Sequence, residues 1–179
     1  KQAEELTANL FWGLDFNVDY MSAVLGCEYS DGTIHYFDEI RQSNSNTQNL
    51  SQTMRRIAPD INVYPDSSGK NRSTTSNKSD HQILIDNGFN VISKKANPPI
   101  IDRINALNRM LMDANGKVRM TVDPKCTYLI KDLEQVQRSR DGKIDKTKDI
   151  SLTHAFDACS YYIAMKHPVV QRLAQSSQW

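Results

Sequence analysis

Short apolar runs separated by polar turns mark the first forty positions of the chain. Three of these runs, residues 11–17, 20–28 and 33–40, have the length and β-favouring composition that predict consecutive strands. The pair Asp31-Gly32 stands between the second and third runs, where it is typical of a tight hairpin turn. We therefore expect the chain to begin with an antiparallel meander.

From residue 48 onward, helical spacing alternates with short strand-like runs. The helical pattern covers residues 48–58, 79–88, 100–112, 126–135 and 152–166. The strand-like pattern covers residues 60–64, 89–92 and 117–122, the last as an edge strand. The apolar face expected for the third helix consists of Ile101, Ile104, Leu107 and Leu111.

A long polar loop over residues 66–78 and an exposed hairpin over residues 135–148 complete the pattern. This order predicts an α/β fold with a mixed central sheet. The sheet should open as an antiparallel meander and continue as β/α units, with helices on both faces.

Composition narrows the class of protein. At 179 residues, 39% of them hydrophobic, the chain is long enough for one domain with a buried core. Its formal net charge of +1 excludes an overall basic field, so nucleic acid would have to meet a local basic patch. No apolar run approaches the length of a membrane span, and the three cysteines form no CxxC pair, which argues against zinc.

Asp15 fits its surroundings least well of all charged residues. It lies within the apolar run Phe11-Trp-Gly-Leu-Asp-Phe-Asn-Val18, and on a strand its side chain shares a face with that of Phe11. Burying an unpaired carboxylate is costly, whereas a bound divalent ion offsets the cost. A solvated strand face is the alternative that the residue types leave open.

Two further acids occupy comparable positions. Asp66 follows the strand-like residues 60–64, and open α/β sheets bind ligands at such strand ends, although an Asx turn would also explain an aspartate there. Asp157 shares a helical face with His154 and Tyr161 among small residues that permit close packing. A surface position for Asp157 and a structural role for His154 are the alternatives.

Three carboxylates without clustered histidines or cysteines favour Mg²⁺ or Mn²⁺ over Zn²⁺. Two such ions held about 4 Å apart activate water on one side of a phosphodiester and stabilise the leaving oxygen on the other. The residues therefore indicate phosphodiester hydrolysis without a covalent nucleophile.

Basic residues near the second acid are candidates for binding DNA phosphates. Lys70, Arg72 and Lys78 lie in the polar loop, and Lys94 and Lys95 follow a predicted strand. An ordinary solvated surface is the alternative, and we favour it slightly for Lys94 and Lys95.

Three motifs in this order resemble those of a known family: Gly13-Leu-Asp-Phe-Asn17, Tyr64-Pro-Asp-Ser-Ser-Gly69 and Leu152-Thr-His-Ala-Phe-Asp-Ala158. Over about residues 10–168 the chain is similar to the C-terminal nuclease domain of tailed-bacteriophage terminase large subunits, which has a ribonuclease H-like fold. The resemblance implies that Asp15, Asp66 and Asp157 are the metal-binding acids, with His154 beside the third. Because ribonuclease H-like nucleases use more Glu than this set contains, the resemblance also makes Asp19 and Asp149 candidates for an additional ligand.

The resemblance also implies an endonuclease that cuts concatemeric viral double-stranded DNA for genome packaging in the cytoplasm of an infected bacterium. Residues 1–10 would then be a linker from a missing ATPase domain, residues 11–168 the nuclease domain and residues 169–179 a tail. The small terminase subunit and the portal protein are the implied partners, and we expect the fragment to be monomeric. The hairpin of residues 135–148 would lie near the active site and regulate access of DNA.

Two other functions stay open at this point. A Holliday-junction resolvase of the same fold also carries a late His-x-x-Asp-Ala helix, but it would be a two-fold dimer that selects four-way junctions. A non-catalytic DNA-binding or assembly module, with purely structural acids, would show no dependence on metal.

Overall fold

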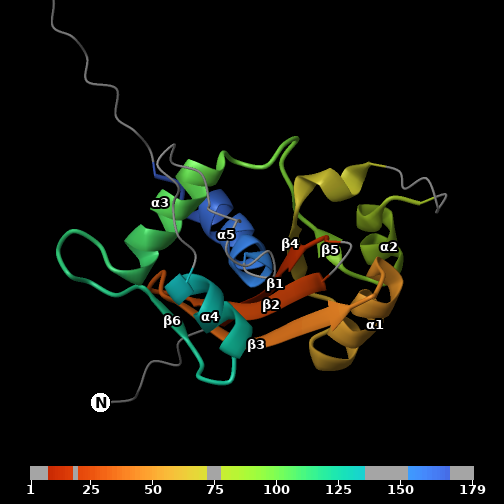
Figure 1. The fold of residues 1–179 in the computed structure, drawn as a ribbon, viewed down its shortest axis with the longest axis horizontal. Helices are drawn as coiled ribbons and strands as arrows, with labels where there is room; N and C mark the ends of the chain where they lie inside the picture. Colours follow the sequence, from red (N-terminus) through yellow and green to blue (C-terminus); the bar gives the residue numbers. More distant parts are fainter. Residues whose placement is uncertain (1–7, 18–19, 72–77, 136–152, 170–179) are drawn as a thin grey trace, which may run out of the picture.

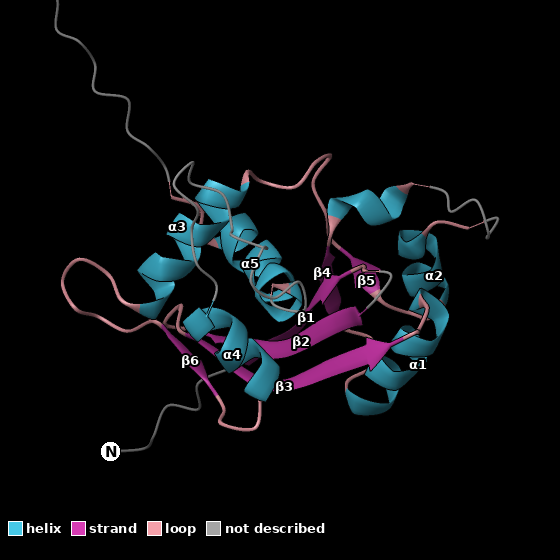
Figure 2. Ribbon diagram, in the orientation of Figure 1, coloured by secondary structure: helices cyan, strands magenta, loops and turns pink. Residues whose placement is uncertain are grey.

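The computed structural model describes residues 8–17, 20–71, 78–135 and 153–169, which contain a six-stranded sheet (Figure 1, Figure 2). The strands are β1 (Ala8–Asp15), β2 (Tyr20–Tyr29), β3 (Ile34–Ser43), β4 (Asn62–Pro65), β5 (Asn90–Val91) and β6 (Met120–Val122). The helices are α1 (Thr47–Ile57), α2 (Asp80–Asp86), α3 (Ile100–Leu111), α4 (Thr127–Gln135) and α5 (His154–Lys166), with a 3-10 turn η1 (Ser67–Lys70).

The first three strands form the predicted antiparallel meander. At the turn between β2 and β3, Gly32 adopts a φ of +77°, which a residue without a Cβ tolerates easily. The carboxylate of Asp31 accepts hydrogen bonds from the backbone N–H and the hydroxyl of Thr33. The Asp-Gly pair thus sets the turn that the sequence indicated.

The remaining strands join the meander as parallel neighbours. β4 pairs with β1, β5 pairs with β4, and β6 pairs with β3, which gives the strand order β5-β4-β1-β2-β3-β6. The predicted mixed sheet with an edge strand at residues 117–122 is therefore confirmed, although β6 begins only at Met120. The carboxyl ends of β1 and β4 lie side by side because these two strands run parallel.

Helices cover both faces of the sheet, as predicted. α3, α4 and α5 pack on the face that Phe11 and Val24 supply, whereas α1 and α2 pack on the face of Trp12 and Leu14. β1 contributes to both cores because its side chains alternate between the two faces. Phe11 also stacks on Tyr162 of α5, with the ring centroids 3.4 Å apart.

α5 is buried from His154 to Ala164 and lies directly on β1. A Cβ added to Gly13 would come within 2.2 Å of the carbonyl oxygen of Ala158. Only a glycine at this place in β1 lets the helix backbone approach so closely. The approach brings the first turns of α5 to the carboxyl end of β1.

The buried face of α3 differs from the predicted one. Ile101 is 37% exposed, while Arg103 is 8% exposed and lies on the buried face with Ile104 and Leu107. The expected apolar face was therefore wrong at Ile101. The helix turns Arg103 inward because its guanidinium finds a buried acid on α5.

Several predictions fall outside the described residues. They are the hairpin of residues 135–148, residues 1–7 of the expected linker and the tail beyond residue 169. Within the described part of the chain, no helix combines the length and apolar character needed to cross a bilayer.

Candidate active site

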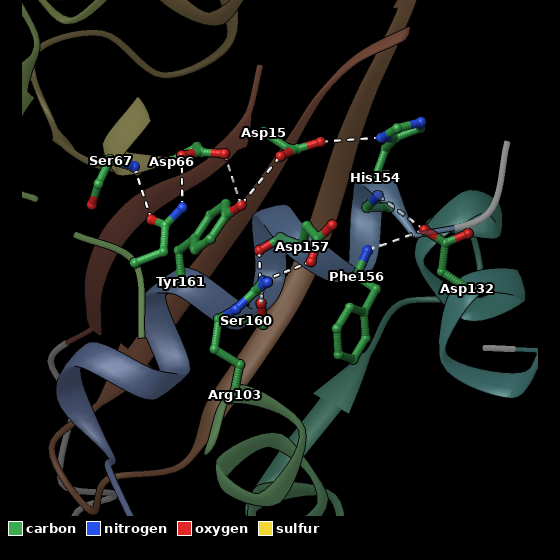
Figure 3. Close-up of polar contacts among 12 residues, drawn as sticks. Asp15, Asp66, Ser67, Arg103, Asp132, His154, Phe156, Asp157, Ser160 and Tyr161 are labelled. Carbon is green, nitrogen blue, oxygen red and sulfur yellow. Dashed lines mark hydrogen bonds and ion pairs between the residues drawn. The ribbon is translucent and has the colours of Figure 1, made fainter. Parts of the chain in front are cut away.

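Asp15 and Asp66 lie at the carboxyl ends of neighbouring parallel strands. Asp15 is the last residue of β1, and Asp66 follows β4 directly. The backbone N–H of Asp66 donates to the carbonyl of Leu14 at 2.9 Å, which continues the ladder between the two strands. The strand ends therefore place both acids at one edge of the same face (Figure 3).

α5 adds residues from its first two turns. Nδ1 of His154 lies 3.1 Å from Oδ2 of Asp15, and both side chains are buried. A carboxylate has no proton to donate, so the hydrogen of this bond belongs to Nδ1. His154 thus fixes one oxygen of the first acid.

The hydroxyl of Tyr161 connects the first two acids. It lies 3.3 Å from Oδ1 of Asp15 and 3.1 Å from Oδ2 of Asp66. A phenol has one proton, so it can donate to only one of these oxygens at a time. Burial raises the pKa of Tyr161 far above its ordinary value, and the charges of Asp15, Asp157 and Asp66 raise it further. All three acids therefore act on one hydroxyl.

Asp66 keeps its charge although it is partly buried. Burial alone would raise its pKa, but hydrogen bonds from the backbone N–H of Ser68 and the amide of Asn97 lower the pKa overall. Asn97 also accepts a hydrogen bond from the N–H of Ser67 at 2.8 Å, so its side chain binds both Asp66 and the residue that follows it. Asp66 forms the Asx turn considered from the sequence with Oδ1 and faces Tyr161 with Oδ2.

Asp157 meets a cation within the fold. Nη1 of Arg103 lies 2.6 Å from Oδ1 of Asp157 and 2.7 Å from the hydroxyl of Ser160. The guanidinium also lies 4.8 Å from the ring centre of Tyr161. α3 thereby contributes a positive charge to the acid cluster, as Figure 3 shows.

The first turn of α5 is held by Asp132 of α4. Oδ2 of Asp132 accepts the backbone N–H groups of Ala155 at 2.9 Å and Phe156 at 3.1 Å. Thr153, the N-cap residue, makes no side-chain cap and has a φ of +103°, which is strained for a β-branched residue. Asp132 therefore caps the helix from outside and fixes the position of His154.

The acids fit a hard divalent cation in kind. Asp15, Asp66 and Asp157 supply carboxylate oxygens, and their three negative charges face one guanidinium, so an excess of negative charge remains. In the described residues, no three His, Cys, Asp or Glu side chains are already arranged to hold an ion. The present contacts of Asp157 with Arg103 occupy part of the coordination that an ion would need. Asp19 and Asp149 lie outside the described residues.

Four of the five predicted phosphate-binding residues lie in the described part of the chain. Lys70 donates to the carbonyl of Lys94, whereas Lys78 pairs with Asp86 of α2 at 2.5 Å. Lys94 and Lys95 are exposed. Arg72 lies outside the described residues.

Gly69 lies in tight internal packing beside Asp66. A Cβ on Gly69 would lie 2.3 Å from the ring of Phe16 and 2.8 Å from that of His81. The glycine is required for internal packing, which presses His81 against Asp66, where Nε2 donates to the backbone carbonyl at 2.8 Å.

Sequence reasoning assigned no site role to Arg103, Asn97 or Asp132, nor to the hydroxyl of Tyr161. Only Tyr161 carried a signal, because its spacing places it on the face of His154 and Asp157. The other three lie on elements that no local pattern links to the acids.

Comparisons with known proteins agree with this architecture. The nuclease domain of the P22 large terminase has a TM-score of 0.69 and 17% sequence identity, over 90% of this chain and 83% of that chain. The nuclease domain of the g2p large terminase from bacteriophage SPP1, with bound Mn, has a TM-score of 0.58 and 19% identity, over 88% and 85%. The large terminase nuclease from thermophilic phage G20c has a TM-score of 0.57 and 15% identity, over 89% and 83%. A comparison with curated protein sequences gives no match.

The mixed sheet, with helices on both faces, defines a ribonuclease H-like domain. A family model described as the terminase RNaseH-like domain matches residues 12–166, so the chain belongs to that family. The resemblance stated from the sequence is confirmed, and so is the ribonuclease H-like fold.

Proposed function

We propose that this domain is a metal-dependent endonuclease that cuts concatemeric viral double-stranded DNA during genome packaging. The observation that carries the proposal is the gathering of three carboxylates from β1, the end of β4 and α5: Asp15 and Asp66 share the hydroxyl of Tyr161, and Asp157 binds the guanidinium that lies against the Tyr161 ring. Burying like charges together opposes folding, so a structural role does not account for the cluster. A site for cations does account for it.

Asp15, Asp66 and Asp157 are the residues that would hold Mg²⁺ or Mn²⁺, and we propose two ions. The SPP1 nuclease domain was solved with bound Mn, and a second structure of the G20c nuclease, with a TM-score of 0.53, has bound magnesium. In such a site, divalent ions supply activation of the attacking water and stabilisation of the leaving oxygen.

The neighbours of the acids position their oxygens. His154 and Tyr161 each hold one oxygen of Asp15, while Asn97 holds Asp66 from the side opposite Tyr161. Groups that orient ligands in this way reduce the free-energy cost of assembling a site. We assign His154 to the site because of its contact with Asp15.

Basic residues near the second acid would hold the phosphate backbone. Lys70 and Lys94 lie together after the second acid, and Lys95 adds a neighbouring charge. We retain Arg72 as a candidate on its position in the sequence. Lys78 is the weakest candidate, because it already pairs with Asp86.

In this proposal the domain works in the cytoplasm of an infected bacterium, after an ATPase domain joined through residues 1–10. The small terminase subunit and the portal protein are its proposed partners, and residues 11–168 are proposed to act as a monomer. Support comes from the family to which the chain belongs.

The proposal is tested by plasmid cleavage with the domain in Mg²⁺, Mn²⁺ or EDTA. We expect nicking and linearisation with either metal and none in EDTA. Asp66→Asn should abolish cleavage with only a small fall in the thermal midpoint, because the amide keeps an oxygen for the turn but loses the charge that the surrounding hydrogen bonds favour.

Asp102→Asn is the matched control, because Asp102 is an exposed acid on α3 away from the acid cluster. Its cleavage should equal that of the unmodified domain. Full cleavage by Asp66→Asn, or cleavage that persists in EDTA, would contradict the proposal. Strong preference for four-way junctions over linear duplex would instead identify a resolvase.

A further inference from the structure

Arg103 occupies an unusual place for a permanently charged side chain. It is 8% exposed, and its guanidinium contacts the third acid, the hydroxyl of Ser160 and the ring of Tyr161. Both hydrogen bonds come from Nη1, while Nε is buried without a partner. An arginine that served only to bind Asp157 would be expected to use two nitrogens in a fork.

We propose that Arg103 is a positioning residue that acts as the resident cation of the metal-free acid cluster and limits how tightly that cluster binds divalent ions. The inference rests on the proposed function, because it concerns the same three acids. It adds a residue of α3 that no motif in the sequence connects with them.

Arg103 stabilises the acid cluster when no metal is bound. Asp157 has a side chain that is 12% exposed, and a buried carboxylate without a positive partner destabilises a fold. Arg103 supplies that partner within 2.6 Å. The cluster can therefore remain folded when no metal is present.

Arg103 would also repel a divalent ion bound to Asp157. A guanidinium stays protonated at all ordinary pH values, so it cannot lose its charge when an ion arrives. An ion on Asp157 would lie within several ångströms of that charge, and at such distances two positive charges repel strongly even at a high effective dielectric constant. Binding of an ion must therefore weaken the contact between Arg103 and Asp157.

The contact with Tyr161 extends the effect to the other acids. Arg103 lies 4.8 Å from the centre of the ring whose hydroxyl joins Asp15 to Asp66. One guanidinium thus contacts both the third acid and the group that links the first two. Movement of Arg103 would therefore change the contacts and the electrostatic environment of all three carboxylates.

The test is calorimetric titration of Mn²⁺ into the domain without DNA. Arg103→Met removes the charge and retains a flexible apolar chain, and we expect it to bind Mn²⁺ at least about tenfold more tightly. In EDTA its thermal midpoint should fall, and Mn²⁺ should raise that midpoint more than it does for the unmodified domain. Arg109→Met, an exposed change on the same helix, should leave the Mn²⁺ affinity as it was.

Two further variants separate charge from packing. Arg103→Lys keeps the charge and should keep an Mn²⁺ affinity close to that of the unmodified domain. If Arg103→Met does not fold, Arg103→Lys is the variant whose Mn²⁺ affinity is measured instead. In an Asp157→Asn background the gain from Arg103→Met should largely disappear, because the repulsion acts through an ion on Asp157. A purely structural arginine would lower stability in both backgrounds without changing the affinity.

Equal or weaker Mn²⁺ binding by Arg103→Met, with binding intact in the unmodified domain, would overturn this inference and leave the proposed function standing. Tighter binding by Arg103→Lys would also overturn it, because the charge is retained there. If neither the unmodified domain nor Arg103→Met binds Mn²⁺, both the inference and the proposed metal site fail.

Discussion

The two faces of the sheet differ in the side chains that they bury. On the face covered by α1 and α2, Trp12 and Leu14 pack into an apolar core. On the opposite face, all buried Asp and Arg side chains of the described residues gather beside α5: Asp15, Arg103, Asp132 and Asp157. β1 shows the contrast most clearly, because Leu14 and Asp15 are adjacent and point in opposite directions.

A small domain can keep a charged site and remain folded when the charges are confined to one face of its sheet. The apolar face stabilises the sheet, and the other face tolerates buried charge because each charge has a partner. Changes on the first face should therefore alter stability, and changes at the acids should alter function.

The largest expected effect on stability comes from Leu14→Ala. It creates a cavity in the α1/α2 core and should lower the free energy of unfolding by about 3 kcal/mol in a urea titration. Asp15→Asn, one residue away, should leave that free energy unchanged or raise it, while abolishing cleavage. If Asp15→Asn lowers the free energy of unfolding as much as Leu14→Ala does, the two faces do not differ in their contribution to stability.

Gly13→Ala tests the close approach of α5 to β1. The added methyl meets the carbonyl oxygen of Ala158, so we expect a loss of about 2–3 kcal/mol in the free energy of unfolding. Gly32→Ala is the control, since its methyl meets nothing and only the left-handed backbone costs about 1 kcal/mol. Equal losses for both variants would show that the approach of α5 adds nothing.

Asp132→Ala removes the cap of α5 from outside the helix. Two backbone N–H groups lose their acceptor, and the free energy of unfolding should fall by about 1–2 kcal/mol. Asp132→Asn keeps an oxygen acceptor and removes the buried charge, whose burial raises the pKa of Asp132, so it should cost less. Cleavage should fall more in Asp132→Ala, because the helix that carries His154 loses its fixed start. Identical stability of the two variants would argue against capping.

Tyr161→Phe is expected to have the smallest effect. In EDTA it should cost about 1 kcal/mol, because one buried hydrogen-bond donor between Asp15 and Asp66 is lost. Mn²⁺ should narrow this gap in thermal unfolding, since an ion then joins the same two carboxylates. Tyr162→Phe is the matched control, because its hydroxyl bonds Glu28 instead. A gap that Mn²⁺ leaves unchanged in Tyr161→Phe would separate the phenol from the metal site.

Much of the fold followed from local patterns in the chain. The meander was predicted from three runs and one Asp-Gly turn. A helix was predicted over residues 79–88, and in the structure the side chain of Ser79 accepts the N–H of Gln82 at the start of α2. The inward turn of Arg103 was not predicted, because helical spacing alone treats arginine as a surface residue. Its position depends on a partner on α5, and no periodicity within α3 contains that information.

The acids of the site were selected from the sequence for a reason that local rules supply: each is a charge among apolar or small residues. The shared contact of Asp15 and Asp66 with the hydroxyl of Tyr161 depends on the parallel pairing of β1 with β4 and on the close approach of α5, which are long-range features. Asn97 and Asp132 could not be found in this way, because each acts on a backbone segment far away in the chain.

On the proposed function, Asp15, Asp66 and Asp157 bind divalent cations together. The most direct test is anomalous diffraction from a crystal of the domain soaked in Mn²⁺. We predict anomalous peaks among these three side chains, about 2.1–2.3 Å from their carboxylate oxygens, with Arg103 moved away from Asp157. Peaks that occur only at exposed acids such as Asp102, with the cluster unchanged, would contradict the claim.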